Sequence, residues 1–209
     1  MDTEYLRKHM AGLHPKLTDE ESYLHAAVLV PLVQIDGEDH ILFEVRSAAM
    51  RRQPGDISFP GGRYEAGDRS AAEAAIRECS EELGIAESAI EYIGSLDRIN
   101  SAIGVRIDAT VGRLHTRAFR PEPAEVGEVF TVPIRTLLEM TPRKAIMEVG
   151  SRPTGDFPFD LLPDYNPEWR VRQTYPVYFY PYKGKNIWGL TALVLTNFLR
   201  IYRDAEALR

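Results

Sequence analysis

The sequence has few of the features expected of a secreted or membrane protein. Its 209 residues include one cysteine, Cys79, which excludes an internal disulfide framework and fits a reducing compartment. The opening residues lack the apolar core of a signal peptide, and apolar runs such as AAVLVPLV at 26–33 are too short to cross a bilayer. We therefore expect a cytoplasmic protein with no membrane partner.

An excess of basic residues is also missing. The formal net charge is −6, from 31 acidic and 25 basic residues, whereas proteins that bind the phosphate backbone of nucleic acids usually carry a basic excess. This balance argues against nucleic acid as a partner. A small anionic substrate is still compatible with it, because such a ligand meets only local charge, and Arg46, Arg51, Arg52 and Arg63 lie close together in the sequence.

The remaining composition is that of a globular protein that can bury a sizeable core, with 44% hydrophobic and 27% charged residues. Residues 26–35 are rich in valine and predict a buried strand, in which Pro31 indicates a bulge or an edge position. Turn residues at 36–39 and a second strand at 40–46 complete a predicted hairpin. Further strands are predicted at 91–96, 105–114, 128–134 and, as an edge strand, 177–180.

Three segments depart from this regular pattern. Residues 1–24 predict an N-terminal appendage made of a short helix and a connector, and residues 47–68 form a long loop of the kind that is usually functional. Repeated prolines across 141–176 predict an irregular insertion. An amphipathic helix is predicted from Leu190 to Leu208. Strands before and after helices favour an α/β sandwich with a mixed sheet.

The clearest helix lies between Ser70 and Gly84. Ser70 and Glu73 predict a capping box at its start, and Gly84 is suited to its C-terminal cap. A helical wheel places small and apolar residues on one side and three glutamates on the other. The apolar side holds Ala72, Ala75, Ile76, Cys79 and Leu83, and the acidic side holds Glu78, Glu81 and Glu82.

The three glutamates are spaced so that their carboxylates repel one another. Like charges at this spacing destabilise an isolated helix by about a few tenths of a kcal/mol per pair, and the helix dipole disfavours anions in the last turn. A divalent cation such as Mg²⁺ reverses the effect, because it prefers carboxylate oxygens and bridges to substrate phosphates. Arg77 can orient one of the glutamates by a charge-assisted hydrogen bond. The alternative is a solvated acidic face, whereas Cys79 is interpreted as a small core residue.

The loop before this helix favours the metal interpretation. Arg46 and Arg51 offer forked donors that match phosphate oxygens. Gly61 and Gly62 allow the backbone to approach an anion or a metal closely. Together with the acidic helix, this loop supplies the cations and carboxylates that a metal–diphosphate complex needs.

These residues resemble the signature of the Nudix hydrolase family. The signature is a glycine, five residues, a glutamate, seven residues, and then Arg-Glu-(apolar)-x-Glu-Glu-x-Gly-(apolar). Here Gly62 starts the match, Asp68 stands where glutamate is usual, and RECSEELGI at 77–85 closes it. The spacing from Asp68 to Arg77 is one residue longer than the general pattern, as in the coenzyme A diphosphatase branch.

The residues upstream resemble that branch more closely. Its pattern of Arg-Ser, Arg, Gly and Phe-Pro-Gly-Gly occurs here at Arg46-Ser47, Arg51, Gly55 and FPGG at 59–62, with three residues in each gap. Residues 125–133 and 187–192 also resemble family positions. Two features differ from the family: Asp108-Ala109 replaces a frequent Thr-Pro, and 141–176 is longer than in compact members. That segment is a lid, a dimer contact or a specificity element.

The resemblance implies a single Nudix hydrolase domain over 1–209, with a Nudix-type α/β/α sandwich. It implies Mg²⁺ or Mn²⁺ held by Glu78 and Glu82, with Glu81 as the next candidate ligand and a backbone carbonyl of Gly61 or Gly62 as a further ligand. Glu125 is a candidate general base from a later loop, beside the glutamates of the signature itself.

The implied reaction is hydrolysis of coenzyme A or its derivatives to 3′,5′-ADP and 4′-phosphopantetheine, with Arg46 and Arg51 facing the diphosphate or the 3′-phosphate. Alternative substrates are ADP-ribose, NADH or another nucleoside diphosphate derivative. A further alternative is a non-catalytic nucleotide-binding module, although such modules typically lose the glutamates that are present here. The family also makes a homodimer an open expectation.

Overall fold

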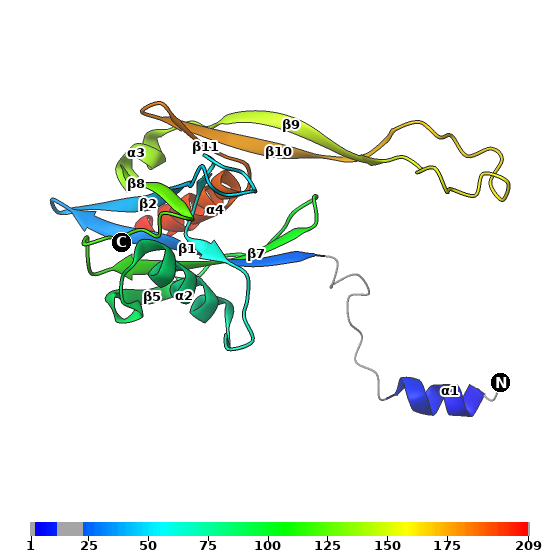
Figure 1. Ribbon diagram of the computed structural model, residues 1–209, viewed down its shortest axis with the longest axis horizontal. Coiled ribbons are helices and arrows are strands. Elements are labelled where there is room, and N and C mark those ends of the chain that lie inside the picture. The colour runs from blue at the N-terminus through cyan, green and yellow to red at the C-terminus, as the bar shows by residue number, and fades with distance from the viewer. Residues whose placement is uncertain (1–2, 12–22, 209) are drawn as a thin grey trace.

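A mixed sheet forms the centre of the computed structural model, which describes residues 3–11 and 23–208 (Figure 1). The order of its main strands is β3-β2-β1-β7-β5, with β4 paired to β1, β6 to β7 and β8 to β2. These strands are β1 (Leu24–Ile35), β2 (Glu38–Arg46), β3 (Ile57–Ser58), β4 (Gly61–Gly62), β5 (Ile90–Ser95), β6 (Ile99–Asn100), β7 (Val105–Leu114) and β8 (Val126–Pro133).

The helices and a second, three-stranded sheet complete the fold. The helices are α1 (Thr3–Met10), α2 (Ala71–Leu83), α3 (Ile134–Glu139), α4 (Gly189–Glu206) and the short 3-10 helix η2 (Glu87–Ala89). The second sheet has the order β11-β10-β9, from β9 (Arg143–Ser151), β10 (Arg170–Tyr182) and β11 (Lys185–Trp188). None of the helices that the structure describes is long and apolar enough to cross a membrane.

The predicted α/β/α sandwich with a mixed sheet is confirmed. β1 pairs in parallel with β7 and antiparallel with β2. Alternate residues of β1 face opposite sides of the sheet, so that Leu29 packs with Cys79 of α2 and Val30 packs with Phe198 of α4. One helix therefore covers each face of the sheet (Figure 1).

Pro31 lies in a central strand, so the edge position allowed for it in the sequence is wrong. On one side β1 pairs with β7 along its length, including Pro31 with Gly112. On the other side it pairs with β4 at Ala27–Val28 and with β2 only from Leu32 onward. Pro31 lies between these two partners, where its missing N–H removes no antiparallel ladder bond.

The segment 141–176 is far more regular than predicted. β9 and β10 form a long antiparallel hairpin that extends beyond the main sheet in Figure 1. The prediction failed because most of the prolines flank the strands or lie in the connection at 152–169, where they interrupt no ladder. The strand predicted at 177–180 belongs to β10, which is the central strand of its sheet and not an edge strand.

The short N-terminal helix predicted within 1–24 is present as α1, whereas the connector after it lies mainly outside the described residues. The predicted hairpin of β1 and β2 is present as well. Asp36 and Gly37 at its turn have φ angles of 51° and 85°, the positive values that a two-residue hairpin turn of this kind requires.

Candidate active site

The ends of α2 are fixed by the residues that the sequence singles out. The Ser70 hydroxyl accepts a hydrogen bond from the Glu73 amide at 3.2 Å. The reciprocal bond of the capping box is shifted by one residue, because the Glu73 carboxylate accepts from the amide of Arg69 rather than of Ser70. At the other end Gly84 has a φ of 60°, and its amide donates to the Glu81 carbonyl. These caps set where the last two turns present their carboxylates.

The three glutamates of α2 do not share one environment. Glu82 is buried, and the side chain of Glu78 is 16% exposed, whereas that of Glu81 is 62% exposed. The helical wheel placed all three on the outer side, which is wrong for Glu82. It borders the apolar stripe, three residues after Cys79, and its Oε2 accepts a hydrogen bond from the Gly61 amide at 2.8 Å.

Gly61 and Gly62 lie very close to neighbouring protein atoms. Gly61 has a φ of 155°, and a Cβ atom there would lie 2.4 Å from the Ala27 carbonyl oxygen. A Cβ atom on Gly62 would lie 2.4 Å from the Glu78 carboxylate. Only glycine lets β4 fit between β1 and α2, and this fit brings the loop backbone against Glu78 and Glu82.

Arg77 connects the carboxylates on the outer side of the helix. It donates to both oxygens of Asp68 at 3.1 and 3.2 Å, to Glu78 at 3.1 Å and to Glu81 at 3.2 Å. These hydrogen bonds lower the pKa of Asp68. The predicted orienting contact of Arg77 with a glutamate is confirmed. Asp68, which replaces the usual glutamate, is the partner that holds the guanidinium in place.

Glu44 is the site residue that the sequence interpretation missed. It lies on β2, is 2% exposed and stands beside Glu82, and its Oε1 has no hydrogen-bond partner among the described residues. Burial raises the pKa of Glu44, and the charge of Glu82 raises it further. A signal was available, since Glu44 interrupts the apolar run ILFEV and shares a strand face with Arg46, two residues away.

Glu125 lies in the turn before β8, close enough for its charge to act on the same carboxylates. Its carbonyl accepts a hydrogen bond from the Ser47 amide at 2.8 Å, which ties this turn to the end of β2. Burial is the main cause of the raised pKa values of Glu44, Glu78 and Glu82, and the charge of Glu125 adds to each. Glu125 itself is exposed.

Of the two predicted substrate-binding arginines, one lies near the carboxylates. Arg46 is half-buried, and its charge partly offsets the effect of burial on the pKa values of Glu44 and Glu82. Arg51 is exposed and makes no hydrogen bond or ion pair with these groups in the described part of the chain. The structure therefore joins Arg46 to the cluster and leaves Arg51 on the loop beside it.

The donor set suits a hard divalent cation. Glu44, Glu78 and Glu82 bring carboxylates to the region where β2, β4 and α2 meet, and the buried Oε1 of Glu44 has no hydrogen-bond partner among the described residues. Within residues 3–11 and 23–208, no three acidic, histidine or cysteine side chains already converge as ligands of one ion. Arg77 instead draws Glu78 and Glu81 toward itself, so a cation has to compete with that guanidinium.

Comparison with known proteins places these features in a family. The chain is 34% identical over 197 residues to the human mitochondrial coenzyme A diphosphatase NUDT8, covering 92% of this chain and 74% of that protein. It is 31% identical over 172 residues to NudL of Photorhabdus laumondii, described as an uncharacterized Nudix hydrolase, covering 82% of this chain and 81% of that one.

Among solved structures, the NUDIX domain of Shewanella oneidensis NrtR, complexed with ADP ribose, aligns with a TM-score of 0.45 and 21% identity over 68% of this chain and 88% of that one. The family model for the NUDIX domain matches residues 23–148. That range contains α2, the loop before it and Glu125. The chain belongs to the Nudix hydrolase family.

Proposed function

We propose that this Nudix hydrolase cleaves the diphosphate linkage of coenzyme A or its derivatives, giving 3′,5′-ADP and 4′-phosphopantetheine. The observation that carries the chemistry is the partly buried carboxylate group of Glu44, Glu78 and Glu82 with Arg46 beside it. The substrate class is supported by the Arg-Ser, Arg, Gly, FPGG pattern before α2 and by the similarity to the human coenzyme A diphosphatase over most of this chain.

Nudix hydrolases generally use divalent metal ions and bind small nucleotide substrates. In this chain Glu78 and Glu82 would hold Mg²⁺ or Mn²⁺, with Glu44 as a further ligand and Glu81 in reach after it leaves Arg77. The bound ions would neutralise the diphosphate and activate water for attack. Gly61 fixes the orientation of Glu82 through its amide, and Arg77 fixes that of Glu78.

The remaining roles follow from exposure and charge. Arg46 can donate to phosphate oxygens from the edge of the carboxylate group, because its guanidinium is only half-buried. Glu125 is exposed and faces the same group, so it can accept a proton from water on the side away from the core. Glu81 is the competing base, and its salt bridge with Arg77 has to open before it can act.

The experiment that tests this function is product analysis by chromatography. Purified protein is incubated with coenzyme A, ADP-ribose or NADH in the presence of Mg²⁺ or Mn²⁺. We expect 3′,5′-ADP from coenzyme A, dependent on the metal and lost in Glu82→Gln. Glu87→Gln is the matched control, since Glu87 is exposed on η2, outside the carboxylate group.

Two other results would change the proposal. Much faster cleavage of ADP-ribose or NADH would show that the diphosphatase chemistry is right and the substrate wrong. Binding of these nucleotides without turnover would instead favour a non-catalytic module. The presence of Arg77, Glu78, Glu81 and Glu82 together argues against that alternative.

A further inference from the structure

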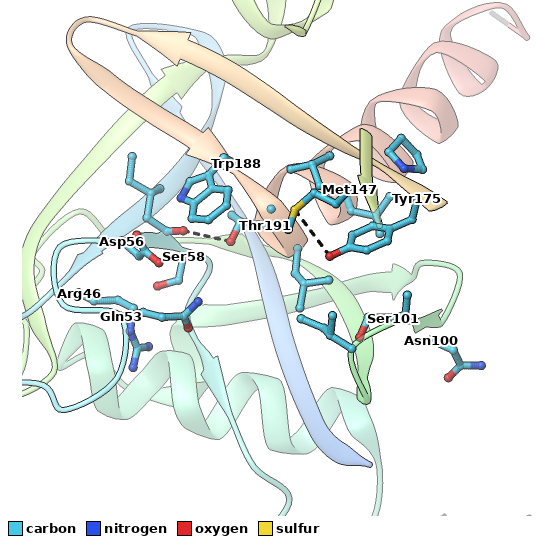
Figure 2. A pocket seen from close by; sticks show the side chains of 18 of the residues that line it. Arg46, Gln53, Asp56, Ser58, Asn100, Ser101, Met147, Tyr175, Trp188 and Thr191 are labelled. Atoms are coloured by element: carbon cyan, nitrogen blue, oxygen red, sulfur yellow. Dashed lines mark hydrogen bonds between the residues drawn. The ribbon is translucent and has the colours of Figure 1, made fainter. Parts of the chain in front are cut away.

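A cavity of about 500 Å³ lies at the start of α4, and Arg46 is among the residues that line it (Figure 2). It is enclosed by the loop at 53–58, the turn at 100–103, the β9–β10 hairpin and the start of α4. Its volume is within the range of pockets that hold small-molecule ligands. The apolar part of its lining comes mainly from Ile57, Ile103, Met147, Val177, Trp188 and Leu190.

Arg46 joins this cavity to the carboxylate group. It lines the cavity, and its charge also acts on Glu44 and Glu82. Figure 2 shows Arg46 and Gln53 on one side of the cavity, with Met147 and Tyr175 on the other. A substrate whose diphosphate contacts Arg46 would therefore extend one of its two arms across the cavity toward the hairpin.

The charge of the lining decides which arm fits. Among the described residues that line the cavity, Arg46 and Asp56 alone carry a formal charge, and the two offset each other. A nucleotide arm carries a 3′-phosphate, which would lose its hydration in this cavity. Arg46 is the one cation of the described lining, so the loss of hydration would be poorly compensated and unfavourable. An uncharged arm loses less hydration free energy when it enters the cavity. The amides of a pantetheine chain can pair with polar lining residues such as Gln53, Ser101 and Gln173.

The hairpin supplies the wall opposite Arg46. Met147 of β9 and Tyr175 of β10 are register partners, and the Tyr175 hydroxyl donates to the Met147 sulfur at 3.7 Å (Figure 2). Trp188 lines the same cavity, so the flexible thioether and the indole both contribute to its lining. Methionine and tryptophan side chains adapt to alkyl chains of different length. The wall is therefore suited to an apolar group at the end of the arm.

We propose that this cavity binds the pantetheine arm of a coenzyme A substrate together with a short acyl group on its sulfur, and that Met147 and Trp188 set the preference for acylated substrates. This inference rests on the proposed function for the reaction, but the binding of the arm is separable from catalysis. It makes the β9–β10 hairpin a specificity element of the enzyme.

The first test is a substrate series of coenzyme A, acetyl-, butanoyl- and hexanoyl-coenzyme A. Burial of each methylene group is worth about a four-fold change in an equilibrium or rate ratio. We expect kcat/KM to rise by up to this factor per added methylene until the cavity is filled. A kcat/KM that is the same for all four compounds would overturn the proposal and leave coenzyme A hydrolysis intact.

The second test compares neighbouring positions on β9. Met147→Glu places a charge against the cavity and should remove the dependence of kcat/KM on acyl chain length. Ile146→Glu is the matched control, because Ile146 is 60% exposed, adjacent in sequence and not part of the lining. Equal effects of the two variants would refute a specific role for Met147.

A binding measurement separates this proposal from the proposed reaction. Hexanoyl-pantetheine, which lacks the diphosphate, is titrated into Trp169→Phe protein, so that Trp188 is the remaining tryptophan. A saturable change in fluorescence that is weakened in Met147→Glu and kept in Ile146→Glu supports the cavity, even if no coenzyme A compound is hydrolysed. Absence of that change would overturn the proposal, even if coenzyme A is hydrolysed.

Discussion

Replacement of Glu44 by glutamine is expected to change how the stability of the metal-free protein depends on pH. Burial and the neighbouring Glu82 raise the pKa of Glu44 above its ordinary value of 4.5. The folded protein therefore holds a proton that the unfolded chain releases as the pH rises above this value. The contribution of Glu44 to the free energy of unfolding is most favourable at low pH and declines as the pH rises toward the raised pKa.

The magnitude follows from the pKa of the unfolded chain. In the unfolded chain Glu44 ionises freely. Relative to that state, keeping Glu44 neutral lowers the free energy of unfolding by about 3 kcal/mol at pH 7 and by less than about 1 kcal/mol at pH 5. The glutamine of Glu44→Gln does not ionise and avoids this pH-dependent cost. As the pH rises from 5 to 7, the free energy of unfolding should fall by about 2–3 kcal/mol more in the wild-type protein than in the variant.

The assay is urea unfolding, followed by circular dichroism in EDTA at pH 5, 6 and 7. The change between pH values is the relevant quantity, because the buried amide of the variant has hydrogen-bonding costs that do not depend on pH. Glu38→Gln is the control, since Glu38 lies on the same strand and is exposed. Parallel pH profiles for wild type and Glu44→Gln would refute the interpretation that Glu44 is buried as a neutral acid.

Four further outcomes are expected. Gly61→Ala should destabilise the protein by about 2–4 kcal/mol in urea unfolding, because the added Cβ would clash with the β1 backbone. Gly67→Ala is the control and should have little effect, because the space around Gly67 is open. Arg77→Lys should lower kcat/KM about 10–100-fold without changing the free energy of unfolding, because lysine cannot donate hydrogen bonds to both oxygens of Asp68 as the guanidinium does. Kinetics equal to those of the wild type would contradict this role. Glu125→Gln should lower kcat by about 10²–10⁴ and alter the pH–rate profile if Glu125 is the base, whereas Glu122→Gln should not. Activity should vanish in EDTA and return with Mg²⁺ or Mn²⁺, and full activity in EDTA would exclude the metal role.

The sequence predicted most of the main sheet because its signals there are local. The valine-rich run of β1, the Asp36-Gly37 turn and the caps of α2 each specify structure within a few residues. The same local character explains the identification of Glu78 and Gly62, which lie within the family signature.

The parts that the sequence did not predict depend on distant partners. The role of Glu44 depends on β2 lying beside α2, which local periodicity does not show. Glu82 lies at the border of the helix stripe, so a wheel without the neighbouring β4 assigned it to the wrong side. The β9–β10 hairpin was missed because its prolines were taken to interrupt strands, whereas most of them lie in the connection at 152–169.

The placement of this hairpin has a consequence for the evolution and engineering of the enzyme. Its strands pair with each other and with β11, and none of the described pairings joins them to the sheet that carries Glu44. Tyr180 anchors the base of the hairpin in the core, while the connection at 152–169 is largely exposed. The connection can therefore be shortened, lengthened or exchanged between relatives as a module, without disturbing the residues that would perform the cleavage.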